Sequence, residues 1–229
     1  MPRVGVLLAG CGVQDGSEIY ETVLTILALE RGGATVIAIA PDIEQFEVIN
    51  HYKGQESRTG EAGGERRDVL AESARIVRGK IMSTREVSSH DLDALIIPGG
   101  YGVVKNLCTY ARDGDAATVN ADVERLIKEL SGLGKPIGAM CAGSMLVALA
   151  LRDKQPNLTV GSDATMSLGL TRLGAQHTVT GVEDIHIDTQ NNVVSTAAFL
   201  LANSASEAEP GITKLVNQVL QMTKAMGAV

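Results

Sequence analysis

The sequence predicts an α/β protein, a three-layer sandwich in which helices cover both faces of a mostly parallel sheet. Short apolar runs alternate with segments of helical spacing along most of the chain. The core must be aliphatic, because aromatic residues make up only 3% of the chain and tryptophan is absent. Aliphatic cores are typical of parallel sheets that are buried on both faces. After Gly174 the pattern changes, which predicts a small antiparallel addition near the C-terminus.

Four apolar runs predict the buried strands, and each ends at glycine, proline or a helix start. They span residues 4–9, 34–40, 94–97 and 136–140. Five helices are predicted. The first begins after Ser17, which can cap it, and two span residues 68–78 and 121–130. One begins at Cys141, and the last follows Pro210-Gly211. Further strands are expected at 176–180, 185–188 and 193–197, with Asn191-Asn192 as a hairpin turn.

We find neither an internal repeat nor a linker, so residues 1–229 are expected to form a single domain. Residues 53–67 are unusual because glycines alternate there with charged side chains. This segment is either a flap beside a site or a solvated surface loop.

Charge and cysteine content exclude several classes of function. The formal net charge of −7 argues against partners such as nucleic acid and anionic membranes. No apolar run reaches the length of a membrane span, and the first residues lack the pattern of a signal peptide. We therefore expect a cytoplasmic protein. Three widely spaced cysteines fit neither a disulfide framework nor a zinc site, so no metal and no cofactor are expected.

Cys141 lies where the strand at 136–140 meets a helix. The residues two positions before and after it, Ala139 and Gly143, are small. Small residues at these positions are required by a nucleophile elbow, a tight turn that presents a side chain above the sheet edge. The helix N-terminus there favours a thiolate, and backbone N–H groups such as that of Ala142 can stabilise an oxyanion. The competing interpretation is a buried structural cysteine.

Two glycine-rich loops are expected at the same edge of the sheet. Residues 98–102 read Pro-Gly-Gly-Tyr-Gly and let backbone N–H groups approach a substrate. Gly10 and Gly12 follow the first strand, but Gly16 lies one position late for a dinucleotide-binding fingerprint. Glu18 stands at the start of the following helix. It is either a functional carboxylate or an acid that favours the helix dipole.

With these residues in hand, the chain resembles the ElbB-like branch of the ThiJ/PfpI superfamily, whose fold is flavodoxin-like and glutamine amidotransferase-like. The resemblance extends over nearly the whole sequence. The matching segments are Ala9-Gly10-Cys11-Gly12-Val13, Asp15-Gly16-Ser17-Glu18, Val48-Ile49-Asn50-His51, Arg75-Ile76-Val77-Arg78-Gly79, Pro98-Gly99-Gly100-Tyr101-Gly102, Lys105-Asn106-Leu107 and Gly134-Lys135-Pro136-Ile137-Gly138.

The resemblance implies that Cys141 is the nucleophile and that Glu18 is its carboxylate partner. Gly100 and Ala142 would supply oxyanion-binding N–H groups. The other implied site residues are Gly99, Asn50 and His51.

The chain also departs from the family. The ElbB-like branch usually carries Ile-Ala-Pro after the cysteine, where this chain has Ala142-Gly143-Ser144, and the histidine of the PfpI branch is replaced by Ala142. An amidotransferase would need a histidine downstream, which leaves only His177 and His186. Cys11 is a second thiol or a packed loop residue, and Cys108 is taken as structural.

Two functions follow from the resemblance. The first is a glutathione-independent, glyoxalase-type lyase that converts small 2-oxoaldehydes to hydroxy acids without a metal, through a hemithioacetal on Cys141 and proton transfer by Glu18. The second is a redox sensor or regulatory protein that uses oxidation of Cys141. In either case a homodimer is expected.

Overall fold

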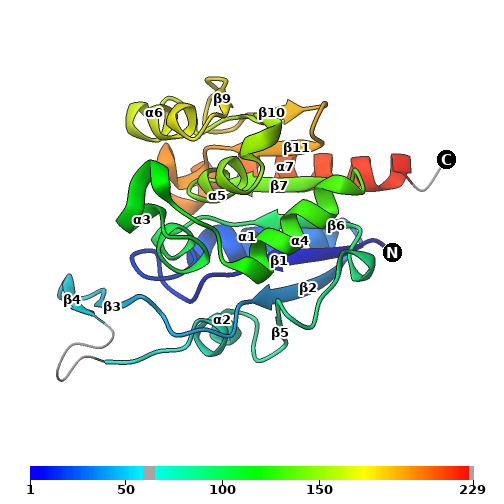
Figure 1. The fold of residues 1–229 in the computed structure, drawn as a ribbon. Helices are drawn as coiled ribbons and strands as arrows, with labels where there is room; N and C mark the ends of the chain where they lie inside the picture. Colours follow the sequence, from blue (N-terminus) through cyan, green and yellow to red (C-terminus); the bar gives the residue numbers. More distant parts are fainter. Residues whose placement is uncertain (59–64, 227–229) are drawn as a thin grey trace.

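The computed structural model describes residues 1–58 and 65–226 (Figure 1). Seven strands form the main sheet, in the order β10-β11-β7-β6-β1-β2-β5. Every neighbouring pair is parallel except β10 with β11, which confirms the predicted fold class. The strands are β1 (Arg3–Leu7), β2 (Thr35–Ala40), β5 (Met82–Ser83), β6 (Ala94–Ile97), β7 (Ile137–Met140), β10 (Ile185–Asp188) and β11 (Val193–Thr196).

Helices cover both faces of this sheet, and each face has its own apolar core. On one face α1 (Ile19–Arg31) and α7 (Ala205–Met226) pack together, with Leu29 and Leu215 fully buried. On the other face lie α4 (Ala121–Gly132) and α5 (Gly143–Ala150), with Leu126 and Val147 fully buried (Figure 1). The remaining helices are α2 (Val69–Ile76), α3 (Tyr110–Asp113) and α6 (Ala164–Arg172).

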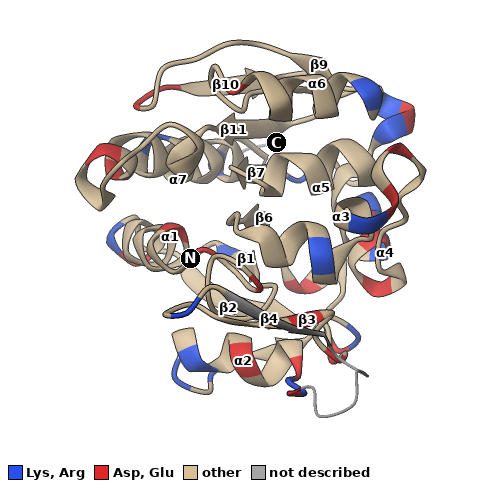
Figure 2. Cartoon of the chain, turned by 90° about the vertical axis from the view of Figure 1, so that its left-hand side faces the viewer, with Lys and Arg blue, Asp and Glu red and all other residues tan. Residues whose placement is uncertain are grey.

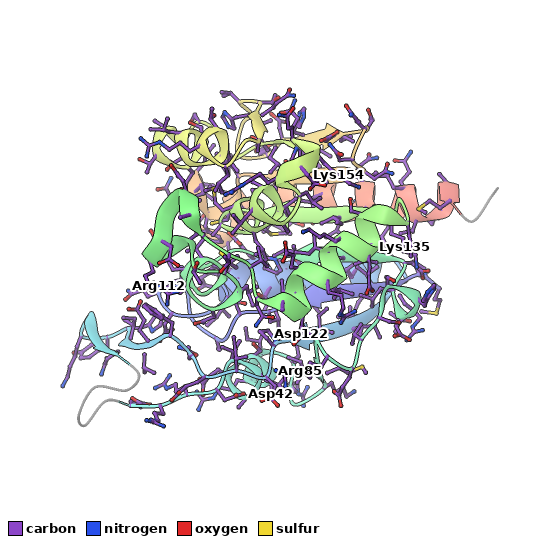
Figure 3. All side chains as sticks on the ribbon, viewed as in Figure 1. Asp42, Arg85, Arg112, Asp122, Lys135 and Lys154 are labelled. Atoms are coloured by element: carbon purple, nitrogen blue, oxygen red, sulfur yellow. The ribbon has the colours of Figure 1, made fainter. Side chains whose placement is uncertain are left out.

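Polar contacts fix α4 and its flanking loops to the sheet. Arg85, which follows β5, pairs with Asp122 in the first turn of α4 at 3.0 Å (Figure 3). Lys135 precedes β7 and donates to the carbonyl oxygens of Ser89 and Leu92 at 2.7 and 2.6 Å. These contacts hold the amino end of β7 beside that of β6. The carboxyl ends of both strands lie at the opposite edge of the sheet.

The antiparallel addition is smaller than the sequence pattern suggests. The turn at Asn191-Asn192 joins β10 to β11 as predicted, and Asn192 takes a left-handed conformation with φ 55°. However, β11 itself pairs in parallel with β7, so β10 alone runs against the sheet. The strand expected at 176–180 is only β9 (Gln176–His177), which pairs in parallel with β8 (Asn157–Leu158) outside the main sheet.

A hairpin projects from the carboxyl edge of the sheet. It consists of β3 (Glu47–Asn50) and β4 (Gln55–Arg58), which pair antiparallel. The segment singled out at 53–67 begins in the turn of this hairpin, and residues 59–64 lie outside the described part of the chain. The alternatives of a flap and a surface loop therefore both stay predictions.

Short helices complete the connections between the strands. They are the π-helical turn Val103–Leu107 and the 3₁₀ turns Ser89–Asp91, Gly114–Ala116, Arg152–Lys154 and Ala198–Leu200. Within residues 1–58 and 65–226, no helix is both long and apolar enough to cross a membrane. Figure 2 views the molecule from the carboxyl edge of the parallel strands: charged residues mark the outer helices and loops, and β6 and β7 at the centre carry none.

The start of α1 differs from the prediction. Glu18, not Ser17, is the N-cap, and its side chain accepts a hydrogen bond from the backbone N–H of Glu21. Ser17 is fully buried, and its hydroxyl accepts from the N–H of Ala9 at 2.8 Å. The hydroxyl of Ser17 therefore satisfies a backbone N–H just after the first strand, rather than one in the first turn of the helix.

Candidate functional site

Cys141 occupies a strained turn between β7 and α5. Its φ is +52°, a left-handed conformation that is costly for a residue with a side chain. Its N–H donates to the carbonyl of Thr196 at 3.2 Å, and its carbonyl accepts from Ser144. A Cβ on Gly143 would lie 2.4 Å from the carbonyl oxygen of Ile97, so only glycine fits there. The turn therefore has the geometry expected of a nucleophile elbow.

Backbone N–H groups converge on the sulfur of Cys141. Those of Gly100 and Ala142 both hydrogen-bond to it and favour its ionised form. Gly100 has φ +98°, and a Cβ there would lie 2.4 Å from the carbonyl oxygen of Gly16. The loop at 98–102 therefore approaches the sulfur because it carries glycine at this position. These are the two N–H groups that the sequence suggested for oxyanion binding.

The carboxylate beside the thiol belongs to Glu21. This side chain lies in the first turn of α1, is fully buried and hydrogen-bonds Cys141. One of its oxygens accepts from the N–H of Gly99 at 2.6 Å, and the other accepts from the N–H of Phe199 at 3.2 Å. Three segments that are far apart in sequence therefore meet at one carboxyl group.

Glu18 has a different role from the one that the family resemblance suggested. Its Oε2 accepts from the N–H of Glu21 at 2.6 Å, which caps α1. The capping residue lies outside the helix, whereas Glu21 is inside its first turn and points toward the sulfur. The structure thus replaces the expected pairing of Glu18 with Cys141 by a pairing of Glu21 with Cys141. Glu21 was missed because the choice of Glu18 followed the family resemblance, and Glu21 lies three residues further along the chain, in the first turn of α1.

Burial governs the protonation of the pair. It raises the pKa of Glu21 from an ordinary 4.5 to about 8, opposed by the N–H groups that bind the carboxylate. Burial, followed by the negative charge of Glu21, raises the pKa of the Cys141 thiol well above its ordinary value. Two adjacent negative charges are disfavoured at such a site. At neutral pH the pair therefore holds at least one proton, and a thiolate forms only when Glu21 is protonated.

A second strained residue shapes the same site. Ala198 has φ +46° and follows the carboxyl end of β11. This turn brings the N–H of Phe199 onto Glu21, while Thr196 accepts from the N–H of Cys141. The sequence analysis missed this segment because Thr-Ala-Ala-Phe carries no motif. The one signal for this segment was its position: it follows a strand of the sheet, and the segments that follow parallel strands lie at the same edge as Cys141.

Of the other predicted site residues, Gly99 lies against the pair, because a Cβ there would stand 2.9 Å from the sulfur of Cys141 and 2.8 Å from Oε2 of Glu21. Gly99 directs its N–H to Glu21. The amide oxygen of Asn50 accepts from the N–H of Lys53 at 3.1 Å within the hairpin turn. The imidazole of His51 accepts from the N–H of Gln14 at 3.2 Å and stands 3.8 Å from Asp15. Asn50 therefore shapes the hairpin turn, and His51 contacts the loop after β1.

The two downstream histidines, His177 and His186, lie on β9 and β10. His177 and His186 interact with each other, and burial lowers the pKa of His186. Glu21 rather than either histidine hydrogen-bonds the thiol. Within residues 1–58 and 65–226 we find no group of three or more His, Cys, Asp and Glu side chains arranged to hold a metal ion.

Comparison with known proteins places the chain among relatives over nearly its whole length. Residues 9–202 match the model of the DJ-1/PfpI family. The human glutamine amidotransferase-like class 1 domain-containing protein 3, mitochondrial, is 43% identical over 96% of this chain and 83% of its own length. The rat ES1 protein homolog, mitochondrial, is 42% identical over 96% of this chain and 84% of its own length.

A solved structure shows the same fold. The isoprenoid biosynthesis protein with amidotransferase-like domain from Ehrlichia chaffeensis superimposes with a TM-score of 0.87 at 31% identity, over 96% of this chain and 99% of the other. The names of the mammalian relatives correct the expected cytoplasmic location, because both are mitochondrial proteins. Composition did not reveal this, since targeting segments rather than the folded domain determine cellular location.

Proposed function

The chain belongs to the DJ-1/PfpI family, and from this membership and its site we propose that it is a thiol-dependent enzyme acting on small 2-oxoaldehydes without glutathione. One observation carries the proposal: a buried glutamic acid, Glu21, hydrogen-bonds a thiol held in a strained elbow. Such a pair combines a nucleophile with a proton carrier, which is what the conversion of a 2-oxoaldehyde to a hydroxy acid requires.

With one proton on the pair, the higher pKa of Cys141 places that proton mainly on the sulfur. The reaction proceeds through the less populated tautomer, thiolate and glutamic acid, which the N–H groups of Gly100 and Ala142 favour. The sulfur of Cys141 adds to the aldehyde carbon, and a C–S bond forms while the carbonyl oxygen becomes an alkoxide. The N–H groups of Gly100 and Ala142 support this oxyanion. The alkoxide then takes the proton of Glu21, which leaves a hemithioacetal and a carboxylate. The carboxylate no longer faces a negative sulfur, because the sulfur is now bonded to carbon.

Glu21 next acts as a base within the adduct. It removes the proton from the former aldehyde carbon, which gives an enediolate, and returns that proton to the neighbouring carbon. A proton passes between the two oxygens, and the product is a thioester of a 2-hydroxy acid. Water cleaves the thioester and restores the thiol. The first carbon is oxidised and the second is reduced, so the reaction needs no external oxidant or reductant.

Several finer assignments are part of this proposal. Membership of the ElbB-like branch is supported by the likeness to the Ehrlichia isoprenoid biosynthesis protein. A single domain over 1–229, a homodimer, and the absence of nucleic-acid and membrane partners stay predictions, the last supported by the net charge of −7. The redox-sensing alternative uses the same Cys141 thiolate, so turnover of methylglyoxal is the measurement that separates it from the proposed enzyme.

The test is consumption of methylglyoxal without glutathione by the native chain, Cys141→Ala and Cys11→Ala. We expect Cys141→Ala to fall to the background rate, because no other described thiol contacts Glu21. Cys11→Ala serves as the matched control and is expected to retain activity within about twofold. A native rate equal to that of Cys141→Ala would refute the proposal.

A further inference from the structure

A cleft of about 670 Å³ opens over β2, between α1 and the segment that follows α2. Ala34 and Val36 in its lining stand at the amino end of β2, whereas Cys141 follows the carboxyl end of β7. Because β2 and β7 run in the same direction in one sheet, the cleft and the thiol lie at opposite edges. Clefts of this volume are large enough to hold a small ligand.

The floor and walls of the cleft are apolar. Ala34, Val36 and Ala38 alternate along the chain, so their side chains point to the same face of the sheet. Two of the three are alanines, which leaves room above the strand. Ile26 of α1 forms one wall, and Ile76 at the end of α2 belongs to the other. Both isoleucines are half-buried, so apolar surface stays open to a ligand.

Two cationic side chains, Arg78 and Lys80, line the same cleft beyond the end of α2. Both are exposed, and neither forms an ion pair with any residue in the described parts of the chain. The acid in the lining, Glu30, belongs to the last turn of α1, on the other wall. An anionic group on a ligand is therefore attracted to the wall that follows α2.

We infer that this cleft binds a small apolar monocarboxylic acid. The tail lies on the alanine floor between the two walls, and the carboxylate meets Arg78 and Lys80. Burial of the tail removes apolar surface of the ligand and of the cleft from water. Repulsion from Glu30 directs the carboxylate to the opposite wall. The inference is independent of the proposed function, because the acid undergoes no reaction and the cleft shares no residue with the thiol site.

The test is calorimetric titration of the native chain, Lys80→Gln and Lys53→Gln with decanoate. Lys53 is an exposed lysine in the turn between β3 and β4, outside the cleft, so Lys53→Gln is the matched control. We expect the native chain to bind decanoate, Lys80→Gln to bind it about two- to fivefold more weakly, and Lys53→Gln to bind it unchanged. No binding by the native chain, or equal affinity in all three proteins, overturns the inference.

A ligand series tests the tail and the carboxylate separately in the native chain. We expect hexanoate to bind at least about tenfold more weakly than decanoate, because its shorter tail covers less of the floor. Decanol lacks the charge and should bind about two- to fivefold more weakly than decanoate. Cys141→Ala should bind decanoate as the native chain does. Equal affinity for hexanoate and decanoate, or loss of decanoate binding in Cys141→Ala, refutes the assignment to this cleft.

Discussion

Two strand-to-helix junctions meet at the thiol, and they differ in length. β7 ends at Met140 and α5 begins at Gly143, so the junction consists of Cys141 and Ala142. β1 ends at Leu7 and α1 begins only at Ile19. The short junction leaves the chain one tight path, whereas the long one folds back on itself before it presents a carboxylate. Short junctions can therefore be interpreted from residue size alone, and long ones cannot.

The largest expected effect comes from breaking the short junction. In Gly143→Ala the added Cβ would lie 2.4 Å from the carbonyl oxygen of Ile97. We expect the free energy of unfolding to fall by about 3 kcal/mol, because the clash is with backbone that cannot rotate away. Urea denaturation measures this. Gly132→Ala is the control, since a Cβ there meets nothing within 4 Å. Equal losses in both variants would remove the steric argument for the elbow.

The pH dependence of stability tests the carboxylate that the long junction presents. The pKa of Glu21 is about 8 in the folded chain and near 4.5 when exposed. Between these values the folded state binds more protons than the unfolded state, so the free energy of unfolding falls as pH rises from about 4.5 to about 8. Below about 4.5 this loss is absent, because both states are protonated.

We expect Glu21→Gln to flatten that slope, because the amide does not titrate. Burial also raises the pKa of Glu18, so Glu18→Gln is the comparison variant and should reduce the slope by less than Glu21→Gln. Thermal unfolding at a series of pH values measures both variants. The same slope in native chain and Glu21→Gln would show that Glu21 is not the buried acid described above.

The smallest effect concerns the cap at the end of the long junction. Glu18→Ala removes the acceptor of the Glu21 N–H, and we expect the free energy of unfolding to fall by about 1 kcal/mol. Asp163→Ala removes the corresponding cap of α6, whose side chain accepts from the N–H of Met166 at 2.7 Å, and should cost a similar amount. A much larger loss in Glu18→Ala alone would give Glu18 a role beyond capping.

These differences explain which parts of the molecule the sequence could predict. The strand at 94–97, the elbow and the two glycine loops follow from local rules of residue size, period and turn chemistry, and the structure has them at those positions. The N-cap of α1 did not follow, because Ser17 and Glu18 are both able to cap and only the burial of Ser17 against Ala9 decides between them.

The pairing of β11 with β7 and the approach of Phe199 to Glu21 were also beyond prediction. Both join segments more than fifty residues apart, and neither has a local sequence signal. The family resemblance named Glu18 as the carboxylate partner of Cys141, whereas the carboxyl group that hydrogen-bonds this thiol belongs to Glu21, three residues further along the chain.

The central claim is that Glu21, not Glu18, is the proton carrier beside Cys141. Its most direct test is kcat/KM for methylglyoxal in Glu21→Gln and Glu18→Gln, since glutamine keeps one acceptor oxygen at each position and removes the carboxyl group that titrates. We expect Glu21→Gln to lose about a hundredfold or more, and Glu18→Gln to stay within about threefold of the native chain. The reverse order, or equal losses in the two variants, would contradict the account.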